Sequence, residues 1–148
     1  MLAEELLRAS GITFAPFAAS RVFISPASQL FGPYANLKDW QATTAAYFRW
    51  EAHHVLEKDD IKRLGAQHRF PSSNEQLCVL LPSSAHRERI NQVLRSANPV
   101  GMIVSASDLV PAYVTAYQIL GNYCGGGEAA IQGELMAIVR AALHYIAK

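Results

Sequence analysis

The chain has 148 residues, of which 51% are hydrophobic and 17% charged, and thirteen basic residues against twelve acidic ones give a net charge of +1. A chain of this length is expected to form one domain, and its high hydrophobic fraction and low charge exclude an intrinsically disordered protein. The net charge also excludes a strongly basic protein that binds nucleic acid through bulk charge, although it leaves room for a local basic site.

The sequence carries no targeting or disulfide pattern. Glu4 and Glu5 stand where a secretory signal peptide would be basic, so a classical signal peptide is not expected. The longest uncharged run, residues 109–127, contains a proline and several glycines, so no membrane-spanning segment is expected. Cys78 and Cys124 lie far apart in the chain, and a disulfide framework is not expected either.

The first third of the chain is predicted from its helix and strand breakers. Residues 2–9 are expected to form a short helix that ends at Ser10-Gly11. Residues 12–36 alternate apolar stretches with proline and glycine, which favours extended or irregular structure with one strand at 21–24. A further short helix is expected over 37–46.

The centre of the chain is predicted as two strands joined by a polar connector. Residues 48–56 are rich in aromatic and β-branched side chains, as strands are. Residues 57–64 permit a helix, and residues 69–74 have the composition of a loop. Residues 76–81 form a short apolar run, expected to be a buried strand that Pro82 ends.

The rest of the chain is predicted to be helical. One helix is expected from Ser83 or Ser84 to about Ser96, with an apolar stripe that includes Ile90 and Leu94. A helix pair is expected at 108–120 and 128–147. The apolar face of its second member comprises Ile131, Leu135, Ile138, Ala142 and Ile146. The predicted fold is therefore a single α+β domain over 1–148, with a helical extension over 105–148.

Four of the five histidines fall between residues 53 and 86. His53 and His54 lie in the predicted strand, and His86 lies in the first turn of the following helix. His86 stands four residues before Ile90, so its side chain is expected to face the sheet. Imidazoles from a strand end and a helix start can hold one divalent metal ion and leave open positions for water or phosphate.

This strand–strand–helix order resembles the HNH, or ββα-metal, nuclease superfamily, and in particular the nuclease toxin domains of bacterial polymorphic toxins. In those domains a Gly-x-Tyr-x-x-Leu-Lys element precedes a Glu-Ala-His-His motif. The corresponding elements here are GPYANLK at 32–38 and EAHH at 51–54. A later strand, proline and helix-borne histidine stand as CVLLPSSAHR at 78–87. The resemblance covers residues 32–95 and implies an HNH-like ββα core over 32–97.

The resemblance assigns a role to each of the three histidines. His53 and His86 would be the protein ligands of one divalent metal ion, which could be Mg, Mn, Ni or Zn. His54 would be the general base that takes a proton from the attacking water, a role that suits a side chain whose ordinary pKa is about 6.5. Because a metal needs neutral imidazoles, activity is expected to fall in acid.

Three further residues are assigned around that centre. Glu51, two residues before His53 on the same strand face, would orient a ligand imidazole, with plain surface exposure as the alternative. Arg87 and Arg89 would contact flanking phosphates, with a solvated helix face as the alternative.

The sequence departs from the superfamily pattern at two positions. The asparagine that usually precedes the helix histidine by about nine residues is here Leu77, and Asn74 stands three residues earlier. A further histidine often found four residues after the helix histidine is here Ile90. His68 is then the remaining candidate for a third protein ligand.

The function implied is a metal-dependent endonuclease that acts as an antibacterial toxin, with DNA before RNA as substrate. By the same resemblance the protein is a bacterial secreted effector that works in the cytoplasm of a target cell, and a cognate immunity protein is its expected partner. Two alternatives stay open: a non-catalytic interaction module of adaptor or immunity type with structural histidines, and a zinc-stabilised domain without turnover.

Geometry discriminates between these functions. A nuclease needs His53 and His86 to converge on a metal, with His54 beside an open position. Neighbouring residues of a strand point to opposite faces, so His53 and His54 can serve one site only where the strand end bends. Histidines on separate faces would argue against both metal-containing alternatives.

Overall fold

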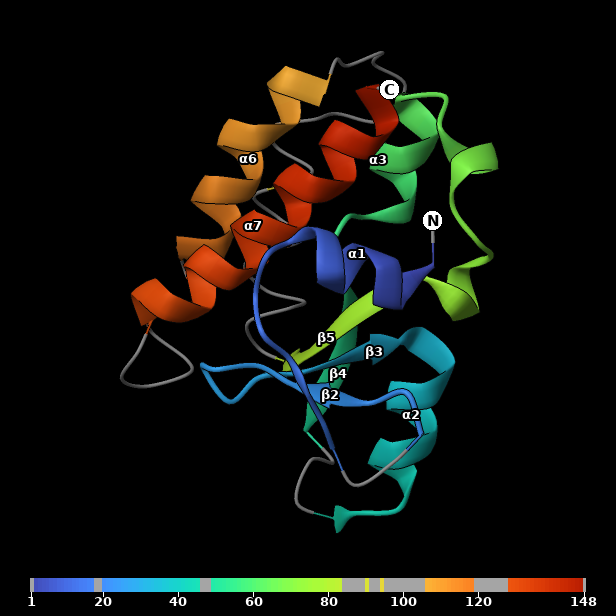
Figure 1. The fold of residues 1–148 in the computed structure, drawn as a ribbon, viewed down its shortest axis with the longest axis vertical. Coiled ribbons are helices and arrows are strands. Elements are labelled where there is room, and N and C mark those ends of the chain that lie inside the picture. The colour runs from blue at the N-terminus through green and yellow to red at the C-terminus, as the bar shows by residue number, and fades with distance from the viewer. Residues whose placement is uncertain are drawn as a thin grey trace.

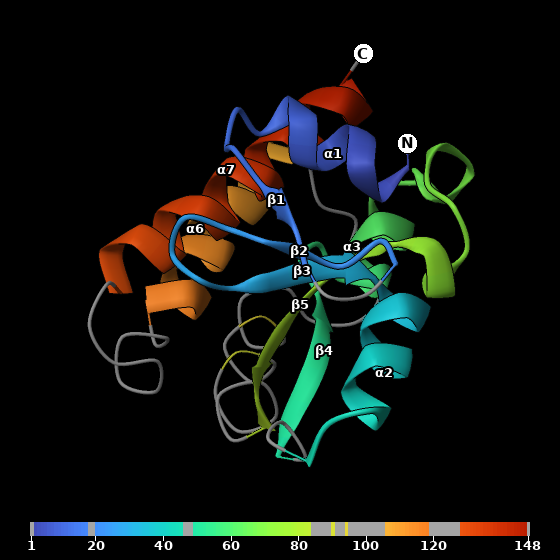
Figure 2. The same cartoon turned by 60° about the horizontal axis from the view of Figure 1, so that its bottom comes forward.

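The structure is a computed structural model that describes residues 2–17, 20–45, 49–83, 90, 94, 106–118 and 128–147. It is an α+β fold in which an antiparallel sheet of five strands carries helices on both faces (Figures 1 and 2). The predicted α+β class is therefore confirmed at this level.

The sheet has the spatial order β1-β2-β3-β5-β4, and every neighbouring pair is antiparallel. The strands are β1 (Ala15–Pro16), β2 (Phe23–Ile24), β3 (Leu30–Pro33), β4 (Trp50–His54) and β5 (Leu77–Pro82). The helices are α1 (Ala3–Ala9), α2 (Tyr34–Ala42), α3 (Lys58–Arg63), α6 (Ala106–Gln118) and α7 (Glu128–Ala147), with short 3-10 helices η2 (Gln67–Arg69) and η3 (Ser73–Glu75).

Two hydrophobic cores lie on the two faces of the sheet because β5 alternates its side chains between them. Leu77, Val79 and Leu81 join the larger core with α1, α6 and α7. Cys78 and Leu80 join the smaller core, which packs against α2. The apolar run at 76–81 is thus a strand buried on both faces, as predicted.

Two of the helices are followed by a glycine in the left-handed conformation. α1 is followed by Gly11 at φ +78°, and α3 is followed by Gly65 at φ +67°, a left-handed conformation that glycine adopts without strain. α2 begins at Tyr34, directly after Pro33, and so starts three residues before its predicted position.

Strand β3 was not predicted, because the glycine and proline within it read as breakers. Gly32 is required there for a different reason. A Cβ at this position would lie 2.5 Å from the Arg21 carbonyl oxygen, so only glycine allows the two backbone segments to approach this closely.

The C-terminal helix pair was predicted correctly. The apolar stripe of α7 is buried against α6 and the sheet at Ile131, Leu135, Ile138 and Ala142. Ile90 and Leu94, from the predicted helix after β5, belong to the same core. None of the described helices has the length and apolar character needed to cross a membrane.

Candidate functional site

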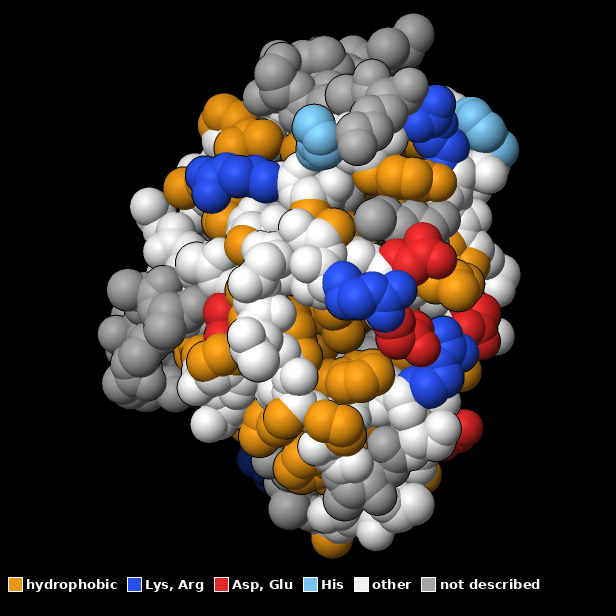
Figure 3. Space-filling model, viewed as in Figure 1, with side chains coloured by type: hydrophobic (Ala, Val, Ile, Leu, Met, Phe, Trp, Pro, Cys, Tyr) orange, Lys and Arg blue, Asp and Glu red, His pale blue; other side chains and the backbone are white. Residues whose placement is uncertain are grey.

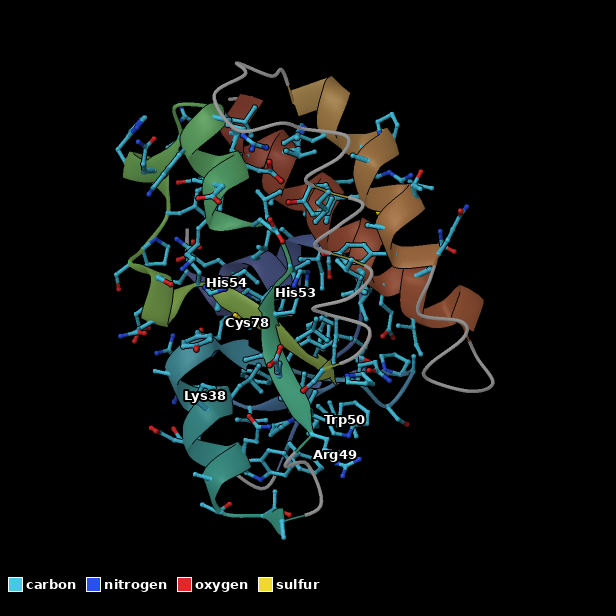
Figure 4. All side chains as sticks on the ribbon, turned by 180° about the vertical axis from the view of Figure 1, so that it is seen from behind. Lys38, Arg49, Trp50, His53, His54 and Cys78 are labelled. Carbon is cyan, nitrogen blue, oxygen red and sulfur yellow. The ribbon has the colours of Figure 1, made fainter. Side chains whose placement is uncertain are left out.

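The Glu-Ala-His-His motif lies on β4, which pairs with β5 so that His53 stands opposite Val79 and His54 opposite Cys78. Figure 4 views this strand from behind with both histidines labelled. The strand is regular up to His54, so its side chains alternate between the two faces of the sheet.

His53 is buried, with 1% of its surface exposed, and contacts α6. Its Nε2 lies 3.1 Å from the hydroxyl of Tyr117, and that hydroxyl donates its single proton to the Val55 carbonyl at 2.5 Å. The hydroxyl must therefore accept from His53, so Nε2 carries the proton. The two rings also meet edge to face, 5.9 Å apart.

A second tyrosine of α6 extends this polar contact to α3. The Tyr113 hydroxyl donates to Asp60 at 2.6 Å and accepts the Glu57 backbone N–H at 2.9 Å. Asp60 in turn accepts from Arg63 at 2.9 Å. Burial raises the pKa of both Tyr113 and Tyr117, and the nearby Asp60 charge adds to the rise, so both hydroxyls stay protonated and donate hydrogen bonds.

His54 is half-buried on the other face of the sheet. Its Nε2 donates to the Ser73 carbonyl at 3.0 Å and has the Ser73 hydroxyl at 3.2 Å. Its ring stacks on Tyr34, with centroids 5.3 Å apart and planes 17° from parallel. A carbonyl oxygen only accepts, so Nε2 carries the proton and Nδ1 is the basic nitrogen of the neutral ring.

The two imidazoles therefore do not share a site. His53 is directed to α6, whereas His54 is directed to α2 and η3 (Figure 4). Glu51 has the strand parity of His53, as predicted, which places it on the face opposite His54. The bend that would let both histidines serve one centre is not present in β4.

The structure describes only some of the remaining predicted site residues. His86, Arg87 and Arg89 lie outside the described residues. His68 is exposed on η2, and Asn74 is exposed on η3 beside the serine whose carbonyl binds His54. Within the described part of the chain, no group of three or more His, Cys, Asp or Glu side chains could hold a metal ion, so these residues do not by themselves fit one.

A cleft of about 540 Å³ lies between α3 and the segment of η2 and η3. Ser73 is part of its wall and is also the residue that binds the His54 imidazole. The cleft carries Lys58 and Lys62 from α3. None of these three residues was predicted as a site residue. The spacing of the two lysines by four residues was a signal for Lys58 and Lys62, whereas no sequence signal pointed to Ser73.

A scan against protein-family models and searches of the curated proteins and of the solved structures found no match to this chain.

Proposed function

We propose that the protein is an endonuclease that hydrolyses phosphodiester bonds, in DNA before RNA, with His54 as the general base. The observation that carries the proposal is the hydrogen bond from His54 Nε2 to the Ser73 carbonyl. A general base needs a third group that fixes its ring and its tautomer, and this carbonyl and the stacked Tyr34 ring supply both.

The chemistry follows from that tautomer. Nδ1 of His54 takes a proton from a water molecule, and the water oxygen forms a bond to phosphorus as the bond to the leaving oxygen breaks. The leaving oxygen takes up a proton from solvent and departs as a hydroxyl. The imidazolium that results keeps its Nε2–H on the Ser73 carbonyl, and this hydrogen bond strengthens when the donor is charged. The same contact therefore orients the base and stabilises its protonated form.

The finer fold assignment belongs to the same proposal. β4 and β5 pair antiparallel, and Ser83 directly after β5 is already helical, which supports an HNH-like ββα arrangement over 32–97. The divalent metal ion stays a prediction, but a metal held by His53 would lie on the face opposite His54, where the His53 Nε2 already donates to Tyr117. Its other expected ligand, His86, lies outside the described residues.

The biological setting rests on the sequence resemblance alone. The motifs at 32–38, 51–54 and 78–87 support an antibacterial toxin delivered into a target cell, with a cognate immunity protein as partner. These remain predictions that depend on the nuclease activity.

Plasmid cleavage tests the catalytic assignment. We expect wild-type protein to cut with one of Mg, Mn, Ni or Zn added, and His54→Ala to cut at least about 100-fold more slowly, since a general base contributes about 10²–10⁴ in rate. The matched control is His144→Ala, an exposed histidine on α7, which should cut as wild type does.

Circular dichroism and thermal unfolding of each variant confirm that it is folded. The assignment is wrong if wild type cuts under no metal, or if folded His54→Ala cuts as fast as wild type. Cleavage that survives a chelator would instead remove the metal from the proposal and keep His54 in it.

The second candidate function is a non-catalytic interaction module with structural histidines. The observation that favours it is the complete burial of His53 on Tyr117, which makes this histidine part of the packing between β4 and α6. In that case no metal supports cleavage, and His54→Ala changes only the stability of the fold.

A further inference from the structure

The cleft beside α3 combines positive charge with hydrogen-bonding side chains. Its volume is about 540 Å³, and the polar residues that line it include Lys58, Lys62, Gln67, Ser72, Ser73 and Gln76. Asp59 is the acidic residue among its lining, so the two lysines leave the cleft with a positive charge. Such a surface is complementary to an anionic ligand such as a phosphate backbone rather than to a cation.

Lys58 and Lys62 stand four residues apart, on one side of α3, and both are exposed. The ion pairs formed within the described residues use Arg21 and Arg63 as their cations, so neither lysine is neutralised by a described acidic partner. Two cations at this spacing can each contact a phosphate of one strand.

The helix that carries the lysines is held firmly in place. Ile61 is buried in the larger core, and Asp60 is held by Tyr113 and Arg63. Burial raises the pKa of the Cys78 thiol, and the positive charge of Lys58 lowers it. Cys78 is the β5 partner of His54, and α3 begins at Lys58, a few residues after β4 ends at His54.

The opposite wall offers both polar and aromatic contacts. Gln76 donates through Nε2 to the Pro71 carbonyl at 2.9 Å, while its buried Oε1 has no hydrogen-bond partner among the described residues. Phe70 adds a half-buried aromatic ring to the same wall. Basic side chains next to an aromatic one are the usual elements of a groove that binds single-stranded nucleic acid.

We propose that this cleft binds the phosphodiester backbone of a nucleic-acid strand, with Lys58 and Lys62 each contacting a phosphate. The inference rests on the proposed nuclease function, because Ser73 joins the wall of the cleft to the His54 imidazole. A strand bound along the two lysines then lies against Ser73, whose carbonyl holds the proposed general base.

Equilibrium binding tests this without any need for catalysis. The probe is a short fluorescein-labelled single strand of DNA, measured by anisotropy on the full chain with a chelator present, at several salt concentrations. An RNA strand of the same sequence is the second arm. The variants are Lys58→Ala and Lys62→Ala, with Lys62→Arg as the conservative exchange, and Lys38→Ala on the exposed side of α2 is the charge-matched control.

Each alanine variant should weaken binding about three- to tenfold and reduce the slope of log K against log salt by about 0.7, because one fewer phosphate is neutralised. Lys62→Arg should restore binding, and Lys38→Ala should bind as wild type does. If the RNA strand binds more tightly than the DNA strand, the cleft assignment stands and RNA is the substrate class.

The cleft assignment is overturned if wild type does not bind either strand, or if both alanine variants behave like Lys38→Ala. Its failure is distinguishable from failure of the nuclease proposal. If binding depends on the lysines but cleavage does not depend on His54, the cleft assignment is supported and the nuclease proposal fails. If cleavage depends on His54 but the lysine variants bind as wild type does, the nuclease proposal is supported and the cleft assignment fails.

Discussion

At the scale of the residue, two adjacent histidines have opposite chemical situations. His53 is enclosed and donates to Tyr117, whereas His54 is half-buried beside a cleft and donates to a backbone carbonyl. Both rings are fixed in the tautomer with the proton on Nε2, but only His54 adjoins the wall of a cleft. The two residues are chemically identical, and the face of the strand on which each lies decides its surroundings.

Tyr117→Phe tests the structural role of His53. The change removes only the hydroxyl, which leaves the His53 N–H and the Val55 carbonyl without this buried partner. We expect the free energy of unfolding to fall by about 2 kcal/mol, the usual cost of buried groups left unsatisfied. Urea unfolding followed by fluorescence measures it.

The matched control is Tyr145→Phe on α7, which keeps its ring contacts with Phe70 and Arg69 and should change stability by less than about 0.5 kcal/mol. A Tyr117→Phe protein as stable as this control would show that the buried contact to His53 adds nothing.

At the scale of the element, α3 is tied to α6 by a buried charged group. Asp60 is 2% exposed and accepts from both Tyr113 and Arg63. This short helix has only six residues, so its position depends on tertiary contacts rather than on its own helix propensity. Its placement in turn sets where the lysines of the cleft lie.

Asp60→Ala should destabilise the protein by about 3–5 kcal/mol, because Arg63 is left as a largely buried charge without its partner. The control is Asp59→Ala, the exposed neighbour on the same helix, for which less than about 0.5 kcal/mol is expected. Thermal and urea unfolding compare the two. Equal stability of the two variants would contradict the anchoring role.

At the scale of the whole molecule, Arg21 joins three segments that lie far apart in the sequence. Its guanidinium donates to both carboxylate oxygens of Glu4 on α1 at 2.9 Å, and to Glu75 on η3 at 2.7 Å. Figure 3 shows basic and acidic side chains gathered over this part of the surface. The N-terminal helix is thereby linked to the loop that also carries Ser73.

This ion pair predicts a pH dependence of stability. The hydrogen bond from Arg21 holds the pKa of Glu4 below its ordinary value of 4.5. A carboxyl group whose pKa is lower in the folded state stabilises the protein at pH values above its unfolded-state pKa. This contribution is lost as the pH falls through the folded-state pKa. Glu4→Gln should therefore cost about 1 kcal/mol at neutral pH, and the difference from wild type should shrink below pH 4.5.

Urea unfolding at intervals between pH 7 and pH 3 measures that difference, with Glu5→Gln, an exposed residue of the same helix turn, as the control. A difference between Glu4→Gln and wild type that stays constant over the whole range would rule out the ion pair as its cause.

Much of the fold could be predicted because the signals are local. Glycines after α1 and α3, the double-sided apolar run of β5 and the apolar stripe of α7 each act within a few residues. β3 could not be predicted, because Gly32 is needed there for the close approach of the Arg21 backbone. Strand pairing brings Arg21 close to Gly32, although the two residues are separated in the sequence.

The candidate site was harder to predict than the fold. The sequence by itself determined the α+β class, the strand that carries His53 and His54, and the alternation that must separate their side chains. Only the tertiary structure decided that Tyr117 encloses one ring and that Ser73 holds the other beside a basic cleft. The physical reason is that a hydrogen-bond partner is chosen by distance in space, and these partners lie 64 and 19 residues away along the chain.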